Sequence, residues 1–204
     1  MDELKFAVIG NPVSHSLSPD IHLFFANQFQ LERYTYNKIK SNENDFERDI
    51  NDFFKNGGVG LNVTVPFKGL AYNLCDELDQ SAGLCKSVNT VLIDSGKLIG
   101  HSTDGQGLID DFLHKEITLE DSKILIIGAG GSAASIISSL LSHGTIKEIS
   151  ILNRTKSNAL RLLDLFETNR LLMHEEGDEY DIVINTTPIS MNVDDIILPP
   201  ELII

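Results

Sequence analysis

The stretch from Lys123 to Ala134 constrains the fold more than any other part of this chain. It begins with a continuous apolar run at residues 124–127, continues through glycines and then enters small residues at helical spacing. Gly128, Gly130 and Ala133 fit the pattern G-x-G-x-x-G/A, in which the first glycine makes a tight turn and the second lets the backbone approach a pyrophosphate. The pattern predicts a strand, a turn and a helix of the dinucleotide-binding type. For this segment alone, a glycine-rich turn that holds no ligand is the alternative.

The residues beyond the glycines distinguish between the two nicotinamide cofactors. A second predicted strand, Glu148 to Leu152, ends at Asn153, Arg154 and Thr155, about twenty residues beyond the glycines, where an NAD-binding unit carries an acidic residue for the ribose 2′-hydroxyl. Arg154 instead offers a planar cation between two neutral donors, which suits a 2′-phosphate. The sequence therefore favours NADP over NAD, the alternative being that Arg154 is a solvated surface arginine.

Charge and cysteine content exclude several classes of function. The net charge of -14, from 16 basic and 30 acidic residues, gives no electrostatic support to nucleic-acid binding. Cys75 and Cys85 have no metal-like spacing, so we expect no metal site and predict two small apolar residues in a reducing compartment. The first residues lack the features of a signal peptide, and no apolar stretch approaches the ~18 residues of a membrane span. We expect a cytoplasmic protein without a membrane segment.

Apolar runs alternate with amphipathic segments along the whole chain, which predicts an α/β fold. The predicted strands are 5–10, 33–39, 59–66, 88–94, 97–100, the run before the glycines, 148–152 and 181–185. The predicted helices begin at Pro19 and follow at 45–54, 71–78, 108–116, after the glycines and at 159–166. Ser95 and Gly96 form a two-residue hairpin signal between two of the strands.

Polar residues collect at predicted strand ends and loops in the first half of the chain. In the strand 59–66, Asn62 and Thr64 share one face, and Lys68 follows its carboxyl end, where ligands bind in open α/β sheets. The full candidate set is Ser16, Ser18, Asn62, Thr64, Lys68, Asn89 and Asp104. Hydroxyls, amides, one lysine and one carboxylate suit a small, polyhydroxylated, anionic substrate. Taken singly, Ser16, Ser18, Asn62 and Thr64 are explained equally well by a turn or strand-end hydrogen bond. Lys68 and Asp104, taken singly, would more often be solvated surface charges.

Several short motifs, in this order and with these separations, closely resemble the shikimate dehydrogenase family. They are the runs 10–19 (GNPVSHSLSP), 62–68 (NVTVPFK), 88–90 (VNT), 102–105 (STDG), 128–131 (GAGG) and 153–155 (NRT). The resemblance implies an N-terminal α/β substrate-binding domain, residues 1–104, and a Rossmann-like NADP-binding domain, residues 105–204. It also implies an oxidoreductase that reduces 3-dehydroshikimate to shikimate with NADPH, in aromatic amino-acid biosynthesis.

The resemblance also implies roles for individual residues. Ser16 and Ser18 would hold the substrate carboxylate, and Asn62, Thr64, Asn89 and Asp104 the ring hydroxyls. Lys68 and Asp104 would be the catalytic pair, because an alkoxide formed by hydride addition needs a proton that a lysine beside a carboxylate can supply. The cofactor would contact Gly128, Ala129, Gly130, Gly131, Ser132, Ala133, Asn153, Arg154, Thr155 and Thr187.

The chain departs from the family pattern in three places. Ser102 stands where the family usually has asparagine, and Ser190, two residues beyond Pro188, stands where it commonly has glycine. The family also continues beyond the equivalent of Ile204 with further strands and a substrate-contacting helix. We therefore expect little dehydrogenase activity from a chain that ends there, because the strand 181–185 would lack a neighbour.

Several alternatives stay open at this stage. The chain is either a dehydrogenase or an inactive, truncated module that retains shikimate or NADP binding. A quinate-preferring relative and the folate methylene dehydrogenase group are further alternatives, although Ser16, Ser18 and the run 62–68 favour shikimate. A homodimer is an open alternative to a monomer.

Overall fold

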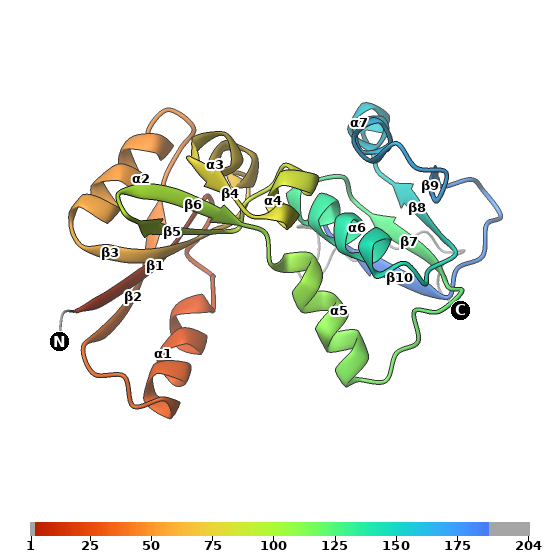
Figure 1. Ribbon diagram of the computed structural model, residues 1–204. Coiled ribbons are helices and arrows are strands. Elements are labelled where there is room, and N and C mark those ends of the chain that lie inside the picture. The colour runs from red at the N-terminus through yellow and green to blue at the C-terminus, as the bar shows by residue number, and fades with distance from the viewer. Residues whose placement is uncertain (1–2, 188–204) are drawn as a thin grey trace.

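The chain folds into two α/β halves, each built on its own sheet (Figure 1). The computed structural model describes residues 3–187. The elements of the first half are β1 (Leu4–Gly10), α1 (Ser18–Gln28), β2 (Tyr34–Lys40), α2 (Phe46–Lys55), β3 (Gly58–Val63), α3 (Lys68–Leu74), β4 (Glu77–Leu78), α4 (Gln80–Cys85), β5 (Thr90–Asp94) and β6 (Lys97–His101). Those of the second half are α5 (Asp104–His114), β7 (Lys123–Ile127), α6 (Gly131–His143), β8 (Glu148–Leu152), α7 (Lys156–Phe166), β9 (Leu171–Met173) and β10 (Ile182–Asn185).

The first sheet has the strand order β2-β1-β3-β5-β6-β4. Strand β1 runs parallel to β2 and β3, whereas β5 is antiparallel to both β3 and β6. Ile9 of β1 lies opposite Val63 of β3, so both strands reach their carboxyl ends at the same edge of the sheet. The loop before α1 and the turn before α3 therefore leave the sheet side by side. Ser16 lies in this loop and Thr64 in this turn, and Ser18 and Lys68 begin the helices that follow.

Side-chain alternation in β1 gives the first sheet two different faces. Ala7 and Ile9 belong to a buried cluster with Phe46 and Ile50 of α2, which covers one face. Val8 belongs to a smaller cluster on the other face, on the side of α1. The expected amphipathic helix at 45–54 is thus confirmed, and its apolar stripe is buried against the sheet.

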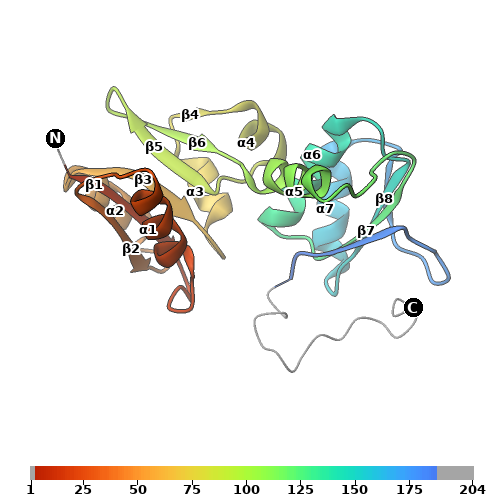
Figure 2. The same ribbon diagram turned by 90° about the horizontal axis from the view of Figure 1, so that it is seen from below.

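The second sheet has the order β10-β7-β8-β9 and is parallel throughout. The centre of β7 is fully buried, with Ile124, Leu125 and Ile126 at 0% exposure, which is typical of a parallel strand covered on both faces. Helix α5 packs against α6, and Figure 2 shows the two helices next to each other beside the first half. Within residues 3–187, β10 lies at an edge, and Val183 is exposed.

Several predicted boundaries were wrong. The helix expected at 71–78 spans Lys68 to Leu74, and Leu78 instead lies in the short strand β4, because Asp76 exchanges hydrogen bonds with the backbone of Leu98. The strand expected at 59–66 ends at Val63, where a turn closed by the Phe67 N–H and the Thr64 carbonyl begins. The helix expected at 108–116 starts earlier, at Asp104.

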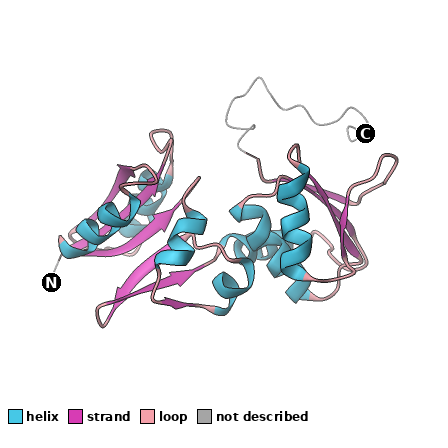
Figure 3. Ribbon diagram, turned by 90° about the horizontal axis from the view of Figure 1, so that it is seen from above, coloured by secondary structure: helices cyan, strands magenta, loops and turns pink. Residues whose placement is uncertain are grey.

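Two short elements were missed, α4 and β9 (Figure 3 shows helices and strands in separate colours). Asp79 caps α4 by accepting a hydrogen bond from the Ala82 N–H at 2.7 Å. This capping carboxylate is the sequence signal that could have located the helix.

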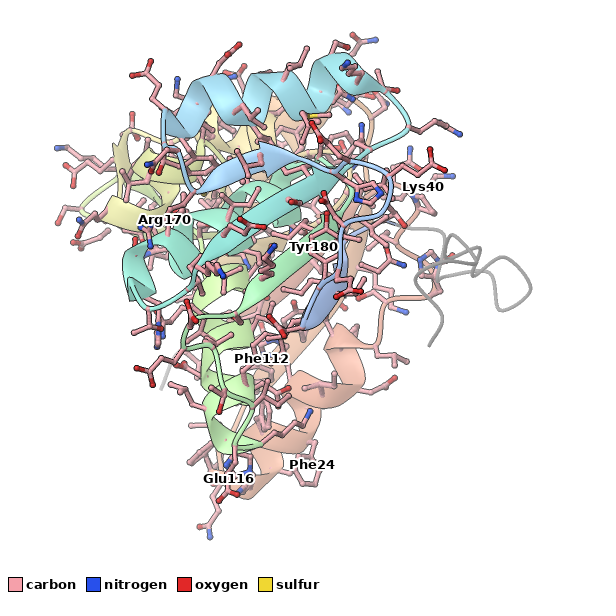
Figure 4. The ribbon with its side chains drawn as sticks, turned by 90° about the vertical axis from the view of Figure 1, so that its right-hand side faces the viewer. Phe24, Lys40, Phe112, Glu116, Arg170 and Tyr180 are labelled. Carbon is pink, nitrogen blue, oxygen red and sulfur yellow. The ribbon has the colours of Figure 1, made fainter. Side chains whose placement is uncertain are left out.

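Helix α1 has the broad apolar surface that the sequence indicates, but this surface is not core. Only Ala26 is buried, whereas Phe24 and Phe29 are 65% and 69% exposed, and Phe24 extends to the edge of the molecule in Figure 4. No helix among residues 3–187 combines the length and the apolar character needed to cross a bilayer.

Candidate active site

A cavity of about 330 Å³ opens at the carboxyl ends of β1 and β3. The turn that follows β3 ends at Lys68, the first residue of α3, and the chain leaves β6 to reach Asp104, the first residue of α5. All seven residues of the predicted set line this cavity: Ser16, Ser18, Asn62, Thr64, Lys68, Asn89 and Asp104. The predicted residues therefore lie together in space, although they are far apart in sequence.

Lys68 and Asp104 form an ion pair inside the cavity. Their side chains are only 14% and 25% exposed, so the pair is shielded from water more than a surface salt bridge is. Asn89 donates from Nδ2 to Oδ1 of Asp104 at 2.5 Å, and the Thr103 N–H donates to Oδ1 of Asn89 at 3.0 Å. The carboxylate is thus held on one oxygen by an amide and on the other by the lysine.

A second polar group surrounds Asn62, which lines the cavity. Tyr36 donates its hydroxyl proton to Oδ1 of Asn62 at 2.7 Å, and Nδ2 of Asn62 donates to Oγ1 of Thr90 at 3.2 Å. Burial raises the pKa of Tyr36 to about 12, so the phenol stays protonated and remains a donor at neutral pH. The carboxamide of Asn62 is therefore held in one orientation toward the cavity.

His22 lies over Tyr36, with ring centroids 4.3 Å apart and an interplanar angle of 16°. It lines the same cavity, and burial lowers its pKa, which favours the neutral imidazole. Neither His22 nor Tyr36 is among the site residues predicted from the sequence. Tyr34 and Tyr36 alternate along β2 and so share one face, but nothing in the sequence indicates that this face borders the site.

The two serines before α1 form a compact hydroxyl pair. Ser16 donates from Oγ to Oγ of Ser18 at 3.1 Å, and the Ser18 N–H donates to Oγ of Ser16 at 3.3 Å. Both hydroxyl groups border the cavity. Ser18 can donate to one oxygen of a carboxylate there, and Ser16 can donate to the other by turning its single proton away from Ser18.

A neighbouring cavity of about 530 Å³ lies over the glycine turn between β7 and α6. Gly128 adopts a φ of +112°, and a Cβ there would lie 2.4 Å from Oγ1 of Thr186, so only glycine fits this position. A Cβ at Gly130 would meet no atom within 4 Å, so this backbone faces open space that a diphosphate can occupy. Thr64 and Lys68 line both cavities, so the two potential ligands meet at Lys68.

The predicted cofactor residues divide into two groups in the structure. Those that line the glycine cavity are Gly128, Ala129, Gly130, Gly131, Ser132, Asn153 and Thr187. Ala133 is fully buried, where it packs α6 onto the sheet, and Arg154 and Thr155 are exposed outside the lining. Asn153 donates from Nδ2 to the carbonyl of Thr155 at 2.8 Å, which fixes the loop that carries Arg154.

The missed residues that line the glycine cavity include Asn158, Arg161 and Thr186. Asn158 and Arg161 are three residues apart on α7 and therefore share one face of this helix, a spacing that could have indicated them. Within residues 3–187, neither Arg154 nor Arg161 has a hydrogen-bonding or ionic partner, so either guanidinium is available to a phosphate.

The serine at position 102 connects the two halves. It is 4% exposed and donates from Oγ to Oγ of Ser135 on α6 at 2.8 Å, and the Gly105 N–H donates to the same Ser135 oxygen at 3.1 Å. Two hydrogen bonds thus tie α6 to the turn that presents Asp104.

Pro188, Ser190 and the run 198–204, singled out in the sequence, lie outside the described residues. Among residues 3–187, no three His, Cys, Asp or Glu side chains gather closely enough to hold a metal ion.

Two family models match this chain. The model described as the shikimate dehydrogenase substrate binding domain matches residues 8–91, and the model described as shikimate / quinate 5-dehydrogenase matches residues 112–195. Together they span well over half of the sequence. The chain belongs to the shikimate dehydrogenase family.

Curated shikimate dehydrogenases align along nearly the whole chain. The shikimate dehydrogenase (NADP(+)) of Acinetobacter baumannii strain ATCC 17978 is 41% identical over 205 residues, which cover 97% of this chain and 78% of the relative. The resemblance inferred from the short motifs is thereby confirmed.

Solved shikimate dehydrogenases share the fold. The shikimate 5-dehydrogenase of Thermus thermophilus, in complex with NADP(H) and shikimate, is 31% identical, with a TM-score of 0.86 over 98% of this chain and 74% of that chain. The Listeria monocytogenes shikimate 5-dehydrogenase, in complex with shikimate and NAD, is 28% identical, with a TM-score of 0.82 over 94% of this chain and 71% of that chain. The predicted fold class, an N-terminal α/β domain followed by a Rossmann-like domain, is confirmed by these neighbours.

Proposed function

We propose that this chain catalyses the NADP-linked interconversion of 3-dehydroshikimate and shikimate, with reduction by NADPH as the direction used in aromatic amino-acid biosynthesis. The observation that carries this proposal is the meeting of two cavities at Lys68. One cavity is lined by hydroxyls, amides and an ion pair, and the other by a glycine turn at the start of a helix. A hydride-transfer enzyme needs this arrangement, because substrate and cofactor must lie side by side.

The first cavity suits the chemistry of the substrate. The hydroxyl pair of Ser16 and Ser18 is assigned to the carboxylate, which accepts hydrogen bonds from both groups. Asn62, Thr64, Asn89 and Asp104 are assigned to ring hydroxyls, which both donate and accept. The fixed orientation of Asn62, set by Tyr36 and Thr90, presents one amide geometry to the ring and so favours one hydroxyl arrangement.

The residues around the second cavity fit an NADP molecule. The first-turn amides of α6 have no acceptor within the helix, and this helix start attracts the diphosphate. Open space at Gly130 lets the diphosphate approach the backbone. Arg154 is assigned to the 2′-phosphate. Thr187 and the glycine turn are assigned to the rest of the cofactor. When bound, NADPH supplies the hydride.

Lys68 is assigned the role of proton donor, and Asp104 positions it. Hydride addition to the ketone carbon leaves an alkoxide on the ring, and the Lys68 ammonium transfers one proton to that oxygen, which gives the alcohol and a neutral amine. Asp104 stabilises the charged lysine before transfer and holds its Nζ toward the cavity. Lys68 then regains a proton from solvent, and the reverse sequence oxidises shikimate.

The test is an absorbance assay of NADP reduction with shikimate, beside quinate and NAD. We expect shikimate with NADP to give the highest kcat/KM of the four combinations. A preference for quinate would assign the chain to the quinate branch that one family description includes. Shikimate and NADP binding without turnover would assign it to the inactive binding modules.

We also infer how this enzyme is organised. A boundary at 104/105, which gives domains 1–104 and 105–204, is supported by the position of Asp104 at the start of α5, since α5 packs on α6. The free thiols of Cys75 and Cys85 support a reducing compartment such as the cytoplasm. The exposed phenylalanines of α1 support association with a second copy, which sedimentation over a range of concentrations tests.

A further inference from the structure

The hydroxyl of Ser132 contacts both members of the catalytic pair. Lys68 donates from Nζ to Oγ of Ser132 at 2.8 Å, and Ser132 donates from Oγ to Oδ2 of Asp104 at 3.3 Å. Since Lys68 also bonds Asp104, the three side chains form a closed triangle. They come from three different helices, α3, α5 and α6, and the sequence separation between Lys68 and Ser132 is 64 residues.

Ser132 also lies within the predicted cofactor cradle. It is the second residue of α6, directly after Gly131, and it lines the glycine cavity. The amides of a first helical turn have no intrahelical acceptor and face an anion at the helix start. One residue therefore presents its backbone to the cofactor phosphates and its side chain to the proton donor.

Close packing fixes the start of α6 against Lys68. A Cβ at Gly131 would lie 2.6 Å from Oγ of Ser87 and 3.2 Å from Cβ of Lys68, so the absence of a side chain at Gly131 is what allows this approach. A small displacement of the helix start would lengthen the bond between Ser132 and Lys68. The ammonium group thus depends on the placement of the second domain.

The number of N–H donors on the Lys68 ammonium explains the effect of Ser132. A lysine has three N–H donors on a flexible stem, so one hydrogen bond leaves the group free to rotate. Asp104 takes one donor and Ser132 takes a second, which leaves a single donor for the substrate oxygen.

We propose that Ser132 is a positioning residue that aims the Lys68 ammonium at the substrate oxygen and couples cofactor binding to the geometry of the proton donor. This inference rests on the proposed function. It differs from a role as a cofactor ligand, because the hydroxyl acts on Lys68 while the backbone amide serves the cofactor.

The test compares three single variants of the full chain. Ser132→Ala removes only the hydroxyl and keeps the amide, whereas Ser132→Thr keeps a hydroxyl. Ser142→Ala is the matched control on the same helix, since Oγ of Ser142 bonds the carbonyl of Ser138, away from the catalytic pair. We expect Ser132→Ala to lower kcat about tenfold, as for the loss of one hydrogen bond to a charged group, with a nearly unchanged KM for shikimate and for NADP.

Calorimetry measures a second quantity, the effect of NADP on shikimate affinity, which would not change if Ser132 had only a structural role. In the wild type, we expect NADP to raise the affinity for shikimate, and this increase should shrink in Ser132→Ala and recover in Ser132→Thr. Ser142→Ala should match the wild type in both measurements.

Two results would overturn the inference and leave the proposed function intact: a kcat of Ser132→Ala equal to that of Ser142→Ala, or a loss confined to the KM for NADP. A wild-type chain that neither oxidises nor binds shikimate would instead refute the proposed function, and the inference with it.

Discussion

Asn89 holds the carboxylate of Asp104 from the side opposite Lys68, with 2.5 Å between Nδ2 of Asn89 and Oδ1 of Asp104. Asp104 therefore accepts hydrogen bonds on both oxygens, from an amide and from an ammonium. Only a carboxylate can satisfy two donors in this way, because a carboxamide has a single acceptor oxygen.

The first prediction follows from this geometry. In Asp104→Asn, one of the two donors, Asn89 or Lys68, must face an NH₂ group, and the charge that holds the lysine is lost. We expect turnover to fall by about 10²-fold or more and shikimate binding to weaken as well, because Asp104 is also assigned to a ring hydroxyl. Steady-state kinetics and calorimetry measure the two effects, and a variant with normal turnover would exclude Asp104 from the catalytic pair.

Removal of the lysine should separate catalysis from binding. In Lys68→Ala, we expect turnover to fall by about 10²- to 10⁴-fold, the usual range for the loss of a positioned acid, with a smaller change in shikimate affinity. Lys40→Ala is the control, since Lys40 is an exposed lysine that does not line either cavity. If turnover in Lys68→Ala matched the control, the proton would have to come from another group.

Arg154 and Arg161 should recognise different parts of the cofactor. Arg161 lines the glycine cavity, so Arg161→Ala should weaken NADP and NAD alike, whereas Arg154→Ala should weaken NADP alone. Each loss should be about tenfold or more, the value of one charged hydrogen bond. Dissociation constants of NADP and NAD for both variants test these assignments, and each arginine serves as the control for the other. An equal loss of NAD and NADP in Arg154→Ala would refute its assignment to the 2′-phosphate.

Two glycines of α5 should respond oppositely to the same substitution. A Cβ at Gly105 would lie 2.2 Å from the carbonyl oxygen of Ser135, so Gly105→Ala must push α5 and α6 apart at a cost of about 1–3 kcal/mol. A Cβ at Gly107 would meet nothing within 4 Å, so Gly107→Ala should raise the free energy of unfolding by about 0.5–1 kcal/mol. Urea unfolding measures both, and equal stabilities would show that the helices do not meet at Gly105.

The buried phenol should make stability depend on alkaline pH. The pKa of Tyr36 is about 12 in the folded chain, against an ordinary value of 10.0, so the unfolded chain loses this proton first as the pH rises. The contribution of Tyr36 to stability is complete below pH 10 and decreases between pH 10 and about 12. Tyr36→Phe should weaken this decrease but not abolish it, because the pKa of Tyr180 is also raised to about 12. Identical pH profiles for wild type and Tyr36→Phe would contradict the prediction.

The regular elements followed from local sequence, and their exceptions followed from tertiary contacts. Strand β8 has the predicted bounds, because five residues of high β-propensity lie between clear turn signals. By contrast, β4 depends on its pairing with β6 and on the hydrogen bonds between Asp76 and Leu98, and no periodicity over two residues can predict such contacts.

Site residues at strand ends and in the adjoining loops were predicted from the sequence. Site residues whose role depends on the direction of their side chains were missed. Lys68 was found because ligands bind at the carboxyl ends of strands in open α/β sheets. Asp104 was found from a polar loop and from the family motif at 102–105. Tyr36 and Arg161 were missed because their contribution depends on which face of β2 meets Asn62 and which face of α7 meets the glycine cavity, and tertiary packing determines both.

The separate cores of the two sheets have a consequence for calorimetry. One core gathers around Ile9 and Leu61, and the other around Ile124 and Ile149, with few buried side chains in common. Two cores of this kind need not melt together, and a single transition temperature then has no defined meaning. A heat-capacity trace with two peaks, which merge when NADP and shikimate bridge the halves, would describe this enzyme better than one midpoint.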